Sequence, residues 1–105
     1  MGRAARLKPV RLGKKLLQIR QVLGLSQDGM VERLDVLGTL TSASISAYER
    51  GQREPPLLVL LRYAELANVY LDALANDSLD LPERIPSVKK HEGVKRVRRV
   101  RKLNR

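Results

Sequence analysis

Apolar residues recur near the start of the chain at the spacing of one helical face. Four of them are separated by four, three and four residues: Leu12, Leu16, Ile19 and Leu23. This spacing is that of an α-helix whose apolar side packs on a core. Gly24 follows directly and predicts the end of the helix, because glycine readily adopts the left-handed conformation that closes a last turn. The pattern predicts a first helix over residues 11–23.

A second, shorter helix is predicted after this glycine. Ser26 is a good N-cap residue, and the helix it opens extends to about Asp35. Three apolar residues form its inner face: Met30, Val31 and Leu34. Residues 36–40, with Gly38 in their middle, are expected to be a connector.

A third helix follows the connector. Thr41 or Ser42 can cap its start, and Gly51 can end it. Between them, Ile45 and Tyr48 are expected to point inward. Together with the preceding helix it makes the compact pair that a helix-turn-helix requires, in which the second helix enters the major groove.

The rest of the body predicts two more helices. Pro55-Pro56 is incompatible with helix just before it and favours the first turn of a new one. The expected inner face of this fourth helix is Leu57, Leu60, Leu61, Ala64 and Ala67. Asn68 suits a left-handed helix end. A fifth helix is expected at about 71–76, followed by an extended segment over 79–86.

Five short helices without a strand signal predict an all-α domain. A chain of 105 residues has room for one such domain. We expect a flexible basic N-terminal arm over residues 1–10, a helical body over 11–80 and an extended, strongly basic tail over 81–105.

Charge is distributed unevenly along the chain. The formal charge is +7 over residues 1–20, −5 over residues 21–87 and +8 over residues 88–105, which together give +10. A mildly acidic body with two basic ends favours a polyanionic partner, either nucleic acid or an anionic membrane surface. Solubility alone is the simpler alternative.

Composition argues against catalysis and against a bound cofactor. The chain has no cysteine and one histidine, His91, and it has no glycine-rich phosphate loop. No group is therefore placed to act as nucleophile, base or metal cage, and we expect neither an enzyme, nor a cofactor, nor a metal site. No segment approaches the roughly 18 apolar residues of a membrane span, which predicts a soluble chain that suits the cytoplasm.

Three motifs occur in order over some sixty residues. They are Leu-Gly-Leu-Ser-Gln at 23–27, Ile45 to Pro55, and Asn68-Val69. In this respect residues 12–74 resemble the XRE family of helix-turn-helix proteins, which includes the phage repressors and Cro. The resemblance implies a five-helix, lambda-repressor-like DNA-binding domain.

The resemblance also implies roles for individual residues. Arg20 and Glu49 correspond to an internal ion pair, although two unrelated surface charges are the alternative. Gln27 corresponds to a glutamine that grips a DNA phosphate, and Arg50 and Arg53 to positions that touch the backbone after the recognition helix. The outward positions of that helix are expected to be Thr41, Ser42, Ala43, Ser44, Ser46 and Ala47.

Two features depart from the family pattern. Ile45 lies nineteen positions after Ser26, about four more than is usual, so the turn carries an insertion. Leu37 and Leu40 could pack this insertion onto the domain by extending the second helix, or the turn could bulge toward the DNA or a partner chain. The outward side chains of the recognition helix are also small, and they offer little base discrimination. Specificity would then depend partly on DNA shape, or the surface could instead dock a protein.

The leading hypothesis is a sequence-selective transcriptional regulator, most simply a repressor, bound as a homodimer to double-stranded DNA. The alternative is a helix-turn-helix docking module whose basic tail binds acidic lipid or nucleic acid. RNA is a third possible partner, but stacking aromatics are scarce. Residues 88–105 supply nine cations: Lys89, Lys90, Lys95, Arg96, Arg98, Arg99, Arg101, Lys102 and Arg105.

Overall fold

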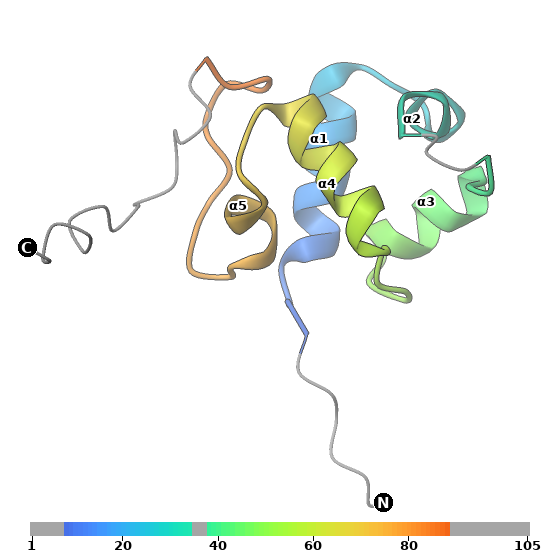
Figure 1. The fold of residues 1–105 in the computed structure, drawn as a ribbon, viewed down its shortest axis with the longest axis horizontal. Helices are drawn as coiled ribbons and strands as arrows, with labels where there is room; N and C mark the ends of the chain where they lie inside the picture. The colour runs from blue at the N-terminus through green and yellow to red at the C-terminus, as the bar shows by residue number, and fades with distance from the viewer. Residues whose placement is uncertain (1–7, 35–37, 89–105) are drawn as a thin grey trace, which may run out of the picture.

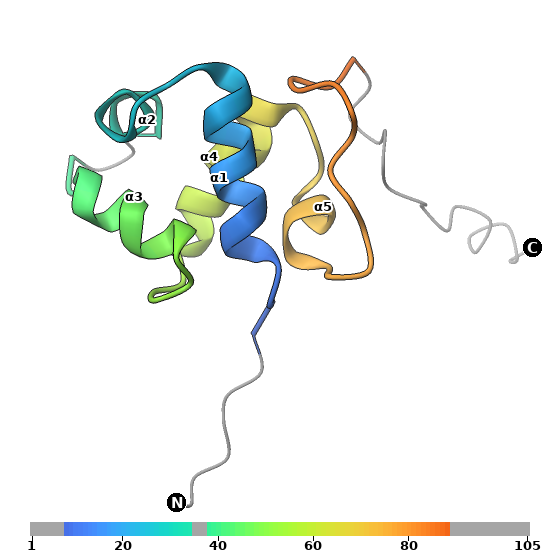
Figure 2. The same cartoon turned by 180° about the vertical axis from the view of Figure 1, so that it is seen from behind.

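The computed structural model describes residues 8–34 and 38–88, and these residues form helices and loops without a strand. Within them, five helices follow one another: α1 (Leu12–Leu23), α2 (Gln27–Leu34), α3 (Ser42–Glu49), α4 (Leu57–Ala67) and α5 (Leu71–Ala75). α1 runs through the middle, with α2 and α3 to one side and α5 to the other, and α4 packs against it (Figure 1). The view from behind shows the same order (Figure 2). The all-α prediction is confirmed.

Local signals end the helices where the sequence predicted. Gly24 closes α1 in the left-handed conformation at a φ of 72°. The Ser26 hydroxyl caps α2 by accepting a backbone amide of its first turn at 2.9 Å. At α3 the Thr41 hydroxyl accepts the amide of Ser44 at 3.2 Å, and Asn68 ends α4 at a φ of 56°. Each of these ends depends on residues within one turn, which is why the sequence predicts them.

One apolar core joins all five helices. Its largest fully buried side chains come from every part of the body: Tyr63, Leu16, Ile19, Met30, Leu34, Ile45, Leu74 and Val69. The predicted inner residues of α1, α2 and α3 belong to this core or pack at its edge. The core therefore positions α3 directly against α1 and α2.

The inner face predicted for α4 is partly wrong. Ala64 and Ala67 are buried as expected, but the core also takes Val59 and Tyr63. Leu60 packs against the core as expected. Leu57 and Leu61, which were expected to face inward, are exposed, and so is Leu58. The helix begins with a run of five apolar residues, which has no polar side to fix its rotation. The large ring of Tyr63 decides the rotation, because its burial removes more apolar surface from water than a leucine does.

The packed body extends beyond residue 80, where we expected the tail to begin. Ile85 is buried within the core. The Ser87 amide donates to the Ala67 carbonyl at 2.9 Å, and the Asn68 side chain donates to the Ser87 carbonyl at 2.7 Å. The segment after α5 is thus fixed to the end of α4. The first seven residues of the expected arm and the tail from residue 89 lie outside the described residues.

Acidic residues from this returning segment cap the start of α1. The Asp77 carboxylate accepts the amides of Val10 at 2.9 Å and Arg11 at 3.0 Å. The Arg11 guanidinium in turn donates to the Asp77 carbonyl at 2.6 Å and forms an ion pair with Asp80. These carboxylates therefore pair with the basic start of the body.

A buried lysine joins the same two parts of the chain. Lys15 is 3% exposed, and its ammonium donates to the carbonyls of Ala73 at 2.7 Å and Asn76 at 3.0 Å. These carbonyls lie at the C-terminal end of α5, where a positive charge is favourable. Burial lowers the pKa of Lys15, and nearby Arg11 lowers it further. α1 and α5 are consequently held together by charge as well as by apolar packing.

The α1 cap predicts a loss of stability in acid. Backbone hydrogen bonds from Val10 and Arg11 lower the pKa of Asp77, and the side-chain bond from Arg11 lowers that of Asp80. A depressed folded-state pKa contributes stability above the unfolded value of about 4, and this contribution is lost as pH falls. We expect urea unfolding to show stability falling below about pH 5, and falling less steeply in Asp77→Asn. An unchanged acid slope in that variant would contradict the cap.

Candidate nucleic-acid interface

α2 and α3 form the helix-turn-helix pair, joined by a turn that includes the predicted insertion. α2 spans residues 27–34, and the described part of the turn, 38–41, is not helical. Gly38 has a φ of 72°, and Leu40 packs half-buried against the core. Leu37, the other leucine expected to anchor the insertion, lies outside the described residues. The described end of the insertion is therefore packed onto the domain next to the start of α3.

α3 presents only part of the expected surface to solvent. Thr41 and Ala43 are exposed, and Ser42 and Ser46 are partly exposed. Together these four residues form a strip of small side chains along the helix. A helix with such small side chains can approach another surface closely.

The outward placement expected for Ser44 and Ala47 is wrong. Each is 8% exposed. Ser44 belongs to the capping box, in which its hydroxyl and that of Thr41 lie 3.2 Å apart. The chain after α3 folds back on Ala47, whose carbonyl accepts the amides of Gln52 at 2.9 Å and Arg53 at 3.3 Å. Both residues therefore shape the ends of α3 instead of facing outward.

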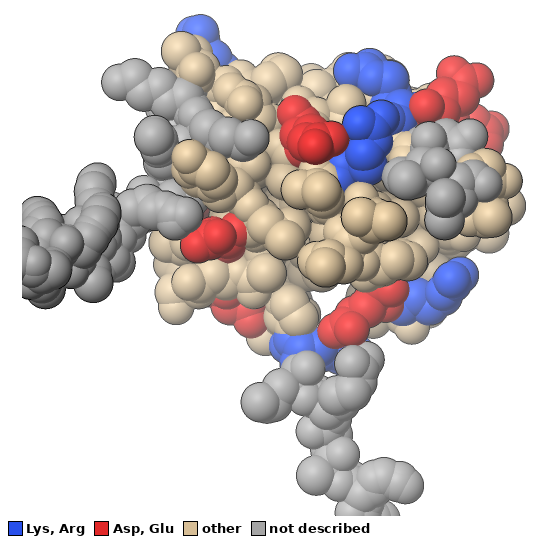
Figure 3. Space-filling view, in the orientation of Figure 1, with Lys and Arg blue, Asp and Glu red and all other residues tan. Residues whose placement is uncertain are grey.

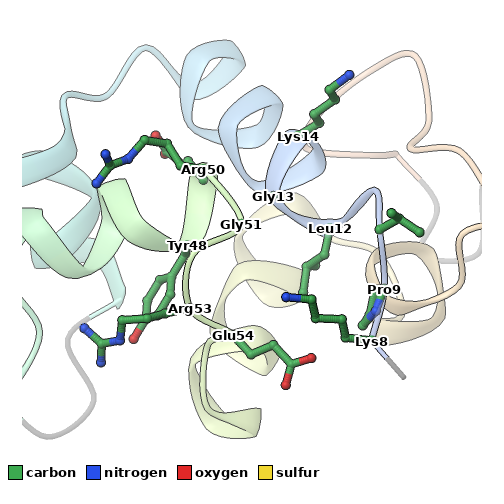
Figure 4. Close-up of a pocket in the computed structure, with 12 residues that line it drawn as sticks. Lys8, Pro9, Leu12, Gly13, Lys14, Tyr48, Arg50, Gly51, Arg53 and Glu54 are labelled. Carbon is green, nitrogen blue, oxygen red and sulfur yellow. The ribbon is translucent and has the colours of Figure 1, made fainter. Parts of the chain in front are cut away.

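Two arginines extend from the end of α3. Arg50 Nε donates to the Ser46 carbonyl at 3.2 Å, so this side chain lies back along the partly exposed strip. The Arg53 guanidinium carbon lies 5.6 Å from the centre of the Tyr48 ring, in a cation–π contact. Figure 4 shows both guanidinium groups reaching back along α3, with Tyr48 between them. Arg50 and Arg53 thus add charge beside the small side chains.

Arg20 and Glu49 form an ion pair between α1 and the end of α3. Arg20 Nε donates to Glu49 Oε2 at 2.6 Å, and Arg20 Nη2 donates to Glu49 Oε1 at 3.1 Å. The Glu49 side chain is 5% exposed and that of Arg20 is 16% exposed. The hydrogen bond to Glu49 raises the pKa of Arg20. Glu49 is therefore oriented into the body and not toward a ligand outside it.

Gln27 joins the same network at the start of α2. Its amide nitrogen donates to Glu49 Oε1 at 3.2 Å, and Arg20 also donates to the Leu25 carbonyl at 2.9 Å. One side-chain network thus fixes α1, the start of α2 and the end of α3. The half-buried Gln27 amide nitrogen carries two hydrogens, so it can donate to Glu49 and to one further acceptor.

The nearby Tyr63 hydroxyl is buried and makes no hydrogen bond within the described part of the chain. Burial raises the pKa of Tyr63, and the charge of Glu49 raises it further. A buried hydroxyl without a partner loses its hydration and gains nothing in return. We expect Tyr63→Phe to raise the free energy of urea unfolding by about 1 kcal/mol. A loss of stability in this variant would show that the hydroxyl has a bonding partner in solution.

A groove of about 310 Å³ lies between the start of α1 and the end of α3 (Figure 4). Four cationic side chains take part in its lining: Lys8, Lys14, Arg50 and Arg53. Lys14 was not among the residues singled out from the sequence. The only signal for it was the net charge of the first twenty residues, because a helical pattern cannot place an exposed lysine next to a distant turn. No group of His, Cys, Asp and Glu among the described residues could hold a metal ion.

This geometry defines the class of protein. A capped helix-turn-helix, with the second helix partly uncovered and arginines at its end, is the arrangement of a DNA-binding domain. The helix-turn-helix family model matches residues 16–74. The chain belongs to the XRE-family helix-turn-helix proteins. The resemblance seen in the sequence is thereby confirmed, and the family match supports a DNA-binding helix-turn-helix regulator. Comparison with curated proteins gave no match.

Proposed function

We propose that this chain is a sequence-selective transcriptional regulator that binds its operator as a homodimer and represses by occupying a promoter. The observation that supports this most is the uncovered strip of α3, fixed to α1 through the Arg20–Glu49 pair. A recognition helix must be held rigidly while its outer side remains free to enter the major groove.

The strip and its neighbours take different roles in this proposal. Thr41, Ser42, Ala43 and Ser46 approach the bases, where small side chains contact thymine methyls and phosphates. Arg50 and Arg53 donate to backbone phosphates, which guanidinium groups bind with two parallel hydrogen bonds. Gln27 and the start of α2 hold a further phosphate. Specificity then depends in part on DNA shape.

Phosphate binding by Arg50 and Arg53 predicts a change in salt dependence. Arg50→Ala and Arg53→Ala should each weaken binding to all duplexes and reduce the slope of log affinity against log salt by about 1. Gel mobility shifts across a salt series measure this slope. Arg84→Ala is the matched control, because Arg84 is exposed and lies in the segment after α5, which Figure 1 shows across α1 from α3. Equal slopes for all three variants would contradict the assignment.

Selection of bound duplexes from a random pool tests sequence selectivity itself. The full chain should enrich one motif, and so should a chain that ends at Val88, if the helical body carries the specificity. Binding to acidic liposomes without binding to DNA would instead support the membrane-surface alternative. No helix among the described residues is both long and apolar enough to span a bilayer.

A further inference from the structure

The outward face of α4 carries an apolar patch that the fold leaves uncovered. Leu57 is 66% exposed, Leu58 56% and Leu61 42%. Their positions on the helix place all three on the side opposite Val59 and Tyr63, which are buried. The space-filling view shows few charged side chains over this part of the surface (Figure 3). We call these three residues the α4 leucine patch.

An isolated exposed leucine needs no explanation, whereas three on one helical face form a contiguous apolar patch. The largest such patch on a monomeric protein is often a binding site. The patch is bordered by one cation and one anion, since Arg62 and Glu65 form an exposed ion pair at 3.1 Å. A surface with an apolar centre and both signs of charge at its edge is complementary to itself.

We propose that the α4 leucine patch is the homodimer interface, in which it meets the same patch of a second copy. The contact is then isologous: the same residues face each other across a two-fold axis. Arg62 of one copy can face Glu65 of the other, while the leucines pack together at the centre. This inference rests on the proposed function, which calls for a dimer on a two-fold operator, and it names the surface that forms it.

The place of the patch in the fold suits this role. α4 begins six residues after the Arg50–Gly51 turn that ends α3, and Figure 1 shows the start of α4 next to the end of α3. Two copies joined through α4 have the ends of their α3 helices close to the joined surface. On a two-fold operator the two recognition helices then occupy half-sites about one helical turn, roughly 34 Å, apart.

The size of the patch predicts a weak dimer. Three partly exposed leucines supply only a part of the roughly 800 Å² per partner that a stable interface buries. Association in solution should therefore be weak. Adjacent half-sites on DNA raise the effective concentration of one copy near the other, so the dimer should form chiefly on the operator.

Cysteine cross-linking tests the contact directly, because the natural chain contains no cysteine. Leu58→Cys should form a disulfide-linked dimer under mild oxidation, faster on duplex DNA than without it. Val22→Cys is the matched control, since Val22 is 52% exposed on α1. Val22→Cys should cross-link at least about tenfold more slowly than Leu58→Cys. Equal rates for the two variants would overturn the proposal.

Exchange of the charges at Arg62 and Glu65 tests the proposed interface independently of folding. Arg62→Glu places two carboxylates at the edge of the patch, and Glu65→Arg places two cations there. Each variant alone should dimerise on a duplex with two half-sites only at about tenfold or higher protein concentration, since like charges meet across the axis. A mixture of the two should recover dimers. A mixture that stays as weak as the separate variants would contradict the pairing, because an ion pair within one helix cannot be restored by mixing.

The result separates this inference from the proposed function. If the variants at Leu58, Arg62 and Glu65 bind single half-sites specifically and yet show no dimer through α4, DNA binding stands and the proposed interface is wrong. If cross-linking succeeds but no duplex is selected, the interface stands and the DNA-binding function fails. A third outcome would assign the patch to the tail and overturn the interface. In that case Leu58→Cys would not cross-link in the full chain but would cross-link in a chain that ends at Val88.

Discussion

Gly13→Ala should destabilise the protein and loosen α3, although alanine is the better helix former. In an exposed helix this substitution gains about 1 kcal/mol. Here an added Cβ would lie 2.7 Å from the Glu49 carbonyl oxygen and 3.0 Å from that of Tyr48. Both atoms belong to the backbone of α3, so the neighbour cannot rotate out of the way. Overpacking of this kind costs about 1–3 kcal/mol, which exceeds the gain in helix propensity.

The same substitution should weaken DNA binding. α3 has to shift away from α1, and the shift displaces the Glu49 backbone next to the Arg20 ion pair. Urea unfolding measures the stability, and a gel shift at a temperature where the variant remains folded measures the affinity. Gly29→Ala is the matched control, because its Cβ would meet only the Ser26 hydroxyl at 3.3 Å and the Leu25 side chain. It should stay within about 1 kcal/mol of the natural chain. If Gly13→Ala were the more stable of the two, the close approach of α1 and α3 would be wrong.

The helix ends could be predicted from the sequence because each depends on neighbouring residues. Gly24, Thr41 and Asn68 act through backbone conformation or a hydrogen bond within one turn. The rotation of α4 could not, because a run of five apolar residues offers the same chemistry on every side. Ser44 is buried by the capping box at the start of α3, and Ala47 by the turn that follows the helix. Helical spacing alone predicts neither contact.

Contacts between distant parts of the chain were the least predictable. Asp77 caps α1 from 66 positions away, and Lys15 reaches the end of α5. Neither has a local signal, since an exposed aspartate and an amphipathic-helix lysine are common in any soluble domain. Gly13 shows the same limit. In sequence it only weakens a helix, whereas in the structure it permits two backbones to touch. The residues of the candidate interface could be predicted where a family motif covers them. The contacts through which α1 holds α3 in place could not.

Arg20→Met should be the most destabilising single change in the side-chain network. It leaves the Glu49 carboxylate, 5% exposed, without its guanidinium partner. Removing one member of a buried ion pair costs about 3–5 kcal/mol, because the remaining charge has been taken out of water without compensation. The Gln27 amide at 3.2 Å is a single neutral donor and cannot replace two charged ones. Urea unfolding at neutral pH measures the loss.

The double variant Arg20→Met/Glu49→Gln distinguishes a buried charge from a mere loss of packing. If the unpaired carboxylate causes the loss, the second substitution should recover about 1–3 kcal/mol, since a neutral amide is less costly to bury. Glu65→Gln, which breaks the exposed Arg62–Glu65 pair, should change stability by less than about 0.5 kcal/mol. A double variant as unstable as Arg20→Met would mean that Glu49 does not carry an uncompensated charge. The ion pair would then hold α3 in place through its shape and packing, and neutral substitutes of similar size should also retain DNA binding.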